Sequence, residues 1–247
     1  MAELPFHPMI GNLIALLQLG GTIVFGQLIA DRLMEAGGWL WRLAVGMVVI
    51  SQSAYLVTFF PEFFWILDLM AWGLALGGFV FVGQFLHSNR LKFRIERPNS
   101  LAAWLAMLLS GSYVLLALGP PTQADALDYH WGVPIYLIRH HHWPPMEMWM
   151  TGSLAGIGEM YILLGMLLHA ENLSTLLQAI SLVGFAYWIS KSQMSLKADF
   201  LRIFVLGVPV LLFFVSGPKP QLFSQVLTAL ALYLTILKKQ IGIKTYI

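Results

Sequence analysis

The sequence predicts an all-α polytopic membrane protein, and three observations support this class. Only 11% of the 247 residues are charged, whereas a soluble domain usually carries about 25%. The hydrophobic residues, 58% of the chain, gather in runs close to the roughly 20 residues that a helix needs to cross a bilayer. The basic residues also fall almost entirely on one side of the membrane when these runs are threaded through it.

Composition excludes several classes of function. The net charge of +2 is too small for nucleic-acid binding, and it reflects basic residues gathered on one side of the membrane. No cysteine is present, so disulfides, thiolate nucleophiles and cysteine-ligated metals are absent. The first residues lack a basic stretch and a small-residue cleavage site, so we expect the first apolar run to be a retained span.

Seven apolar segments predict transmembrane helices in one membrane domain. Residues 1–119 hold four spans, residues 120–172 form an extracytoplasmic loop, and residues 173–247 hold three spans and a cytoplasmic tail. Polar, glycine-containing or proline-containing connections separate the segments, and the 120–149 stretch has no apolar run long enough to cross. The predicted spans are residues 9–30, 39–60, 64–86, 101–118, 175–189, 200–215 and 222–237.

The apolar stretch 150–169 is the ambiguous element, and the positive-inside rule decides it. If this stretch lies on the outer surface, 12 of the 14 Lys and Arg residues face the cytoplasm and only Arg139 and Lys219 face outward. If this stretch crosses the membrane, seven Lys and Arg residues face each side. We therefore expect an interfacial or re-entrant helix, with the N-terminus outside, the C-terminus in the cytoplasm and the protein in a plasma (inner) membrane.

The outer loop holds the first group of candidate site residues. Asp125 is followed at helical spacing by Asp128 and Tyr129, and then by His130. Such carboxylates are often solvated or cap a helix. The functional interpretation is a general base, Asp125, at the membrane surface, with Asp128, Tyr129 and His130 orienting a substrate. The residues alone leave both interpretations open.

Two further clusters lie on the predicted outer side. Arg139 precedes three consecutive histidines, whose side chains on a helix point about 100° apart. We therefore expect no metal or other cofactor there, although a histidine site remains an alternative, and favour an interfacial segment. Glu159 on the interfacial helix faces either headgroups or a cavity. Lys219 and Gln221, between the last two spans, either contact headgroups or bind an anionic group such as a lipid phosphate.

The loop resembles a known family. The stretch PPTQADALDYHWGVP at 120–134, followed by GEMY at 158–161, is similar to the first large outer loop of bacterial GT-C-type glycosyltransferases. In that superfamily this loop carries juxtamembrane helices that lie on the membrane. The chain is shorter than typical members, so we interpret it as a minimal or degenerate member or the N-terminal part of a longer protein.

The resemblance implies transfer of a sugar from a polyprenyl-phosphate carrier to an acceptor on the outer face of the cell envelope. Asp125 occupies the position of the family's catalytic base. Lys219 and Gln221 lie where a second polar cluster contacts the carrier phosphate or the sugar, with Gln221 in place of the usual acidic residue. Arg139 and Glu159 are further candidates for substrate binding.

Two other functions remain open. The chain is alternatively a non-catalytic membrane subunit whose outer loop binds a partner or a lipid-linked glycan. A histidine-metal membrane enzyme is the third interpretation. In each case the expected partners are membrane lipids and other membrane subunits, and not nucleic acid.

Overall fold

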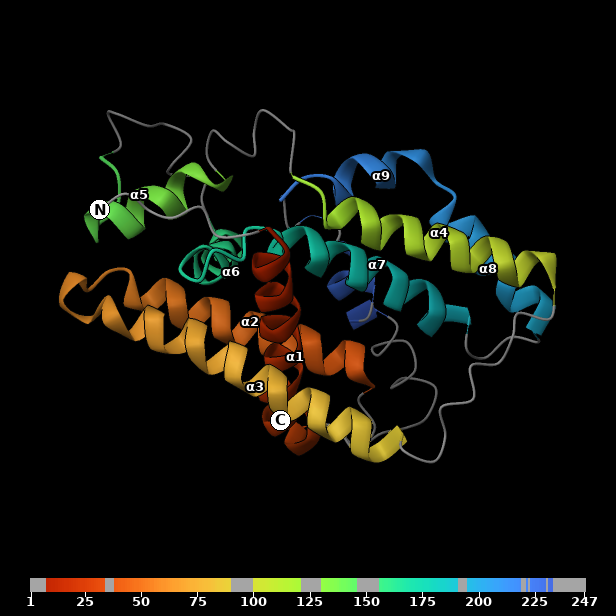
Figure 1. Cartoon of the computed structure of the whole chain (residues 1–247), viewed down its shortest axis with the longest axis horizontal. Coiled ribbons are helices and arrows are strands. Elements are labelled where there is room, and N and C mark those ends of the chain that lie inside the picture. The colour runs from red at the N-terminus through yellow and green to blue at the C-terminus, as the bar shows by residue number, and fades with distance from the viewer. Residues whose placement is uncertain are drawn as a thin grey trace.

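The computed structural model is entirely helical over the part of the chain that it describes, so the predicted all-α class is confirmed (Figure 1). The described residues are 8–33, 38–89, 100–120, 130–145, 156–190, 195–218, 221, 223–229 and 231–232. The elements are α1 (Pro8–Leu33), α2 (Trp39–Val57), the 3₁₀ turn η1 (Pro61–Phe63), α3 (Trp65–Asn89), α4 (Leu101–Ala117), α5 (Gly132–His140), α6 (Ile157–Met166), α7 (Leu173–Ser190), α8 (Ser195–Leu206) and α9 (Pro209–Val215).

Four helices are long and apolar enough to cross a membrane. They match the first, second, third and fifth predicted spans, and their apolar segments are Pro8–Ala30, Trp39–Val57, Pro61–His87 and Leu173–Ser190. The pair α8 and α9 makes a fifth if its two bent halves form one span. α4 is apolar but has only 17 residues, and the last predicted span is described only in part. The chain is therefore a membrane protein by composition, and the count of seven stays a prediction.

Glycines let α1 pack directly against the backbones of α2 and α3, which it crosses in Figure 1. A β-carbon on Gly26 would lie 1.8 Å from the Arg42 carbonyl oxygen, and one on Gly78 would lie 2.2 Å from that of Leu17. Small residues at such crossings allow backbones to approach closely in membrane helices. This three-helix unit supports the outer elements described below.

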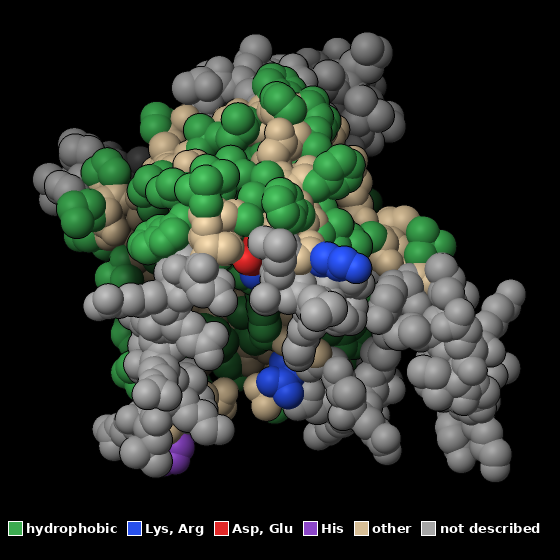
Figure 2. Space-filling model, turned by 90° about the vertical axis from the view of Figure 1, so that its right-hand side faces the viewer, with side chains coloured by type: hydrophobic (Ala, Val, Ile, Leu, Met, Phe, Trp, Pro, Cys, Tyr) green, Lys and Arg blue, Asp and Glu red, His purple; other side chains and the backbone are tan. Residues whose placement is uncertain are grey.

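One end of the molecule gathers the predicted cytoplasmic helix ends. α2, α4 and α8 begin on the right of Figure 1, where α3 and α7 end. Trp39, the first residue of α2, packs so closely at Gly184 of α7 that a β-carbon there would lie 2.4 Å from its ring. Figure 2 shows this end, where Lys and Arg side chains and an acidic side chain lie among hydrophobic ones.

The long connection between α4 and α7 returns to the point from which it leaves. Thr175 Oγ1 donates to the Ala117 carbonyl oxygen at 2.7 Å, and Asn172 Nδ2 donates to that of Leu118 at 3.0 Å. The same Asn172 nitrogen donates to Asn12 Oδ1 on α1 at 2.7 Å. Hydrogen bonds thus join the C-terminal end of α4, the N-terminal end of α7 and the first turns of α1.

Two predicted segments differ in detail from the helices that the structure describes. Among the described residues of the apolar stretch 150–169, the helix is α6, whose 10 residues span about 15 Å, or half of a bilayer core. The predicted span 200–215 is broken and bends by 62° between α8 and α9. Pro209 has no N–H group and forces Val208 into an extended conformation (ψ 111°), so the helix cannot continue. Tyr113 on α4 donates to the Leu206 carbonyl oxygen at the break, at 2.7 Å.

Candidate functional site

Two predicted site residues from opposite ends of the loop meet inside the fold. His130, two residues before the start of α5, places Nδ1 2.7 Å from Oε1 of Glu159 in the first turn of α6. Their side chains are only 5% and 6% exposed. A buried carboxylate requires such a partner, because removing either member of a buried pair typically costs about 3–5 kcal/mol. The pair therefore fixes the start of α5 on the start of α6.

The local sequence explains why Glu159 points back toward the start of α6. Gly156 precedes the helix in an extended conformation (φ −126°, ψ −162°), and its N–H donates to Glu159 Oε2 at 2.7 Å. This is one half of a capping box; the other half is missing because glycine has no side chain to accept a bond. The positive end of the helix dipole also favours a carboxylate here. Each carboxylate oxygen thus has a hydrogen-bond partner.

α6 itself is buried and hydrogen-bonded to α1. Tyr161 is 1% exposed, and its hydroxyl lies 2.6 Å from Thr22 Oγ1, which in turn donates to the Gln18 carbonyl oxygen at 2.8 Å. Gln18 Nε2 donates to the Leu164 carbonyl oxygen at 3.0 Å. Burial raises the pKa of Tyr161 far above its ordinary value, so the phenol stays protonated and acts as the donor to Thr22.

The far end of α5 is held by aromatic contacts. Trp143 Nε1 donates to Thr58 Oγ1 at 3.1 Å, and the indole ring stacks on Phe59 at a centroid distance of 6.0 Å. His141 stacks on Phe64 at 4.5 Å. α5 is therefore a strap (residues 130–143) that is attached by a polar pair at its start and by rings at its end, on the α2–α3 turn.

Two of the three consecutive histidines, His140 and His142, lie near each other, with their ring centroids 5.8 Å apart, and the third packs elsewhere. His141 takes a left-handed backbone conformation (φ 58°) and packs on Phe64, whereas the rings of His140 and His142 lie 4.3 and 5.6 Å from that of Tyr136. Among the residues that the structure describes, no three His, Asp or Glu side chains lie close enough together to hold a metal ion.

Neither Arg139 nor Gln221, the two other predicted site residues that the structure describes, joins the pair. Arg139 is exposed near the opposite end of α5, about 13 Å from His130 along a helix of that length. Gln221 is exposed as well, and no described contact connects it with the loop. Asp125, Asp128, Tyr129 and Lys219 lie outside the described residues.

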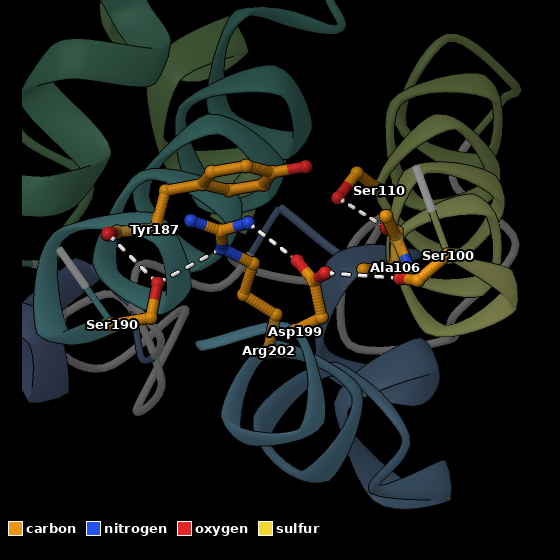
Figure 3. A network of polar contacts seen from close by, with 8 residues as sticks. Ser100, Ala106, Ser110, Tyr187, Ser190, Asp199 and Arg202 are labelled. Atoms are coloured by element: carbon orange, nitrogen blue, oxygen red, sulfur yellow. Dashed lines mark hydrogen bonds and ion pairs between the residues drawn. The ribbon is translucent and has the colours of Figure 1, made fainter. Parts of the chain in front are cut away.

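A second polar network, at the end shown in Figure 2, involves residues that the sequence analysis did not propose as site residues (Figure 3). Arg202 on α8 donates from Nη1 to Asp199 Oδ1 at 2.8 Å and from Nε to Ser190 Oγ at 2.9 Å. Its guanidinium lies 4.3 Å from the ring centroid of Tyr187. Ser100, the N-cap of α4, donates to Asp199 Oδ2 at 3.3 Å. The network joins α4, α7 and α8, and the spacing of Asp199 and Arg202 was the available signal.

The His130–Glu159 geometry also determines the protonation pattern of the pair. An ionised carboxylate only accepts hydrogen bonds, so Nδ1 of His130 carries a proton when Glu159 is charged. A neutral His130 then has its basic lone pair on Nε2. This arrangement can orient an imidazole or anchor the strap by a charge-assisted bond.

No curated protein and no solved structure matches the chain. A family model described as the DUF1420 N-terminal domain matches residues 77–246. This match covers more than half of the chain and contains α4 to α9 together with the His130–Glu159 pair. The chain therefore belongs to the DUF1420 family.

Proposed function

We propose that this protein is a GT-C-like membrane glycosyltransferase. It moves a sugar from a polyprenyl-phosphate carrier to an acceptor on the outer face of a plasma membrane. The observation that carries this proposal is the buried contact of His130 with Glu159 at 2.7 Å. Two residues expected at one substrate site, 29 positions apart in the sequence, are thereby held together between the loop and a short helix.

The proposed topology has seven crossings, an extracytoplasmic N-terminus and a cytoplasmic C-terminus. Supporting it, the hydrogen bonds of Thr175 and Asn172 bring both ends of the α4–α7 connection to one place. α6, with 10 residues, is too short to cross alone. Of the described basic side chains, Arg42, Lys197 and Arg202 belong to α2 and α8, close to the opposite helix ends, and Arg139 belongs to α5. The positive-inside rule favours such an excess on the cytoplasmic side.

The reaction balances with the proposed groups. An acceptor hydroxyl oxygen forms a bond to the anomeric carbon of the sugar, and the bond from that carbon to the carrier phosphate breaks with its electron pair on the phosphate oxygen. Asp125 takes the hydroxyl proton. Lys219 stabilises the departing phosphate, for which a point charge suffices. His130 and Glu159 keep the loop against the fold while this occurs.

The test is sugar release from a labelled donor. Liposomes that contain the purified protein receive polyprenyl-phosphate mannose, glucose or N-acetylglucosamine with a tritiated sugar, together with membrane extract as the acceptor source. The unmodified protein is expected to consume one donor, and Asp125→Asn is expected to lose at least about 100-fold in rate. Glu171→Gln, which removes the charge of an exposed carboxylate on the same connection between α4 and α7, is the matched control. Undiminished release by a correctly inserted Asp125→Asn variant removes Asp125 from the mechanism.

A non-catalytic role is the second candidate, and one observation favours it. Because the His130 and Glu159 side chains are only 5% and 6% exposed, the pair itself presents little surface to a substrate. In this role Asp125 and Lys219 tolerate substitution, and the liposomes bind a labelled carrier lipid without consuming it. Substituting Trp143 does not discriminate between the roles, because its ring packs on Phe59 and contributes to the fold in both.

A further inference from the structure

We infer that His130 and Glu159 are positioning residues that form a latch between the strap and α6. Sequence reasoning expected them to contact substrate. The geometry points instead to a closed contact that determines where the acidic segment before His130 is held. The catalytic consequence rests on the proposed function, whereas the latch itself does not.

Hydrogen bonding and burial support the latch. Oε1 of Glu159 faces His130 Nδ1, and Oε2 accepts from the Gly156 N–H, both at 2.7 Å. Each carboxylate oxygen thus already has one hydrogen-bond partner within the protein. The residues that follow Glu159 in α6, from Met160 to Leu164, are at most 1% exposed, so α6 is a fixed support and not a mobile element.

The two attachments of the strap differ in kind. At its end, Trp143 and His141 pack on rings of the α2–α3 turn. At its start, the described side-chain bond to α6 is the His130–Glu159 pair. Below this pair, Val133 and Leu137 are fully buried on the underside of α5. Loss of the pair should therefore release the start of the strap and expose Val133 while the aromatic end stays attached.

The latch limits the position of the proposed base. Asp125 precedes His130 by five residues, and five fully extended residues span at most about 18 Å. With His130 fixed on α6, Asp125 cannot lie farther than this from the latch. Without the latch, the nearest fixed point is the more distant aromatic end of the strap, and the distance that Asp125 can reach is counted from there. The latch therefore restricts the region that Asp125 can reach, which lowers the entropic cost of bringing a base to the substrate.

The absence of native cysteines gives a direct test. Val133→Cys reports opening of the strap, and Ser181→Cys, at a fully buried site on α7, reports global unfolding. Each is introduced alone, and its alkylation by N-ethylmaleimide is timed in lipid vesicles. His130→Ala is expected to accelerate alkylation at position 133 about tenfold or more, as loss of a charge-assisted bond implies, with no change at position 181.

Matched variants sharpen the result. His130→Asn retains a donor to Glu159, so position 133 should stay mostly protected from alkylation. Glu159→Gln has one acceptor oxygen for two donors, so this variant should lose part of that protection. His140→Ala, an exposed histidine on the same helix, is the control and should leave the rate unchanged. Equal alkylation of position 133 with and without His130, or acceleration at both positions together, overturns the latch.

The transfer assay separates the latch from the proposed function. If the chain transfers sugar, His130→Ala should lower kcat by about tenfold or more while the KM for the carrier stays within about twofold. A raised KM with unchanged protection of position 133 assigns His130 to substrate contact and overturns the latch. If the unmodified protein transfers nothing, the proposed function fails and the alkylation rates alone decide the latch.

Discussion

Substituting Gly78 with alanine is expected to force α3 away from α1, because the new methyl group meets backbone and not a flexible side chain. Its carbon would lie 2.2 Å from the Leu17 carbonyl oxygen and 2.6 Å from the Leu17 Cα. The helices must part by about 1 Å to reach normal contact, which forfeits up to half of the dispersion energy at that contact. Overpacking of this kind costs about 3 kcal/mol, and the better helix propensity of alanine returns about 1 kcal/mol.

The net destabilisation is therefore about 2 kcal/mol, or roughly a 30-fold shift in the unfolding equilibrium. Titration with sodium dodecyl sulfate in mixed micelles, followed by circular dichroism, measures it. Gly73→Ala on the same helix is the matched control: a β-carbon added there would meet no atom within 4 Å, so that variant should be as stable as the parent or slightly more stable. If Gly78→Ala is as stable as Gly73→Ala, the close backbone contact between α1 and α3 is wrong.

Two further predictions concern the polar contacts. Arg202→Lys should lower the free energy of unfolding by about 1–3 kcal/mol, because one ammonium group cannot replace the guanidinium fork that serves Asp199 and Ser190 together. Thermal unfolding measures the loss, and Lys197→Met, at an exposed site, should have little effect. Tyr161→Phe should cost about 1 kcal/mol at neutral pH through its lost hydrogen bond, as measured by the same method.

Tyr161 also predicts an alkaline pH dependence. Because burial raises its pKa in the folded state, the phenol contributes its full stability below the unfolded-state pKa of about 10, and this contribution falls as the pH rises above that value. The Tyr161→Phe variant should therefore lose stability less steeply than the parent protein above a pH of about 10. Parallel curves of stability against pH contradict the burial of this phenol.

The sequence was sufficient for the fold class and for most of the helices. Long apolar runs with few charges require helices in a membrane, and α1, α2, α3 and α7 lie close to their predicted positions. The break between α8 and α9 was missed because hydropathy stays high through it, although proline at position 209 was a visible signal. α5 was missed as a helix because its apolar face is short and flanked by histidines and prolines.

The contact between His130 and Glu159 was not predicted from the sequence. His130 and Glu159 were each recognised as candidates, yet apolar periodicity indicates only which face of a helix is buried and not which other element covers it. Arg202 was counted only among the basic residues for the topology, and Asp199 was not considered, because a sequence does not show that Ser190 and Ser100 approach them from two other helices.

The proposed topology requires that the segment joining α4 to α7 stays on one side of the membrane, with the strap outside and the start of α8 inside. Single cysteines at His140 and Lys197, both exposed, test it in intact cells with a membrane-impermeant maleimide. We expect His140→Cys to react from outside and Lys197→Cys to react only after the membrane is permeabilised. Reaction of both from outside would show that the topology is wrong.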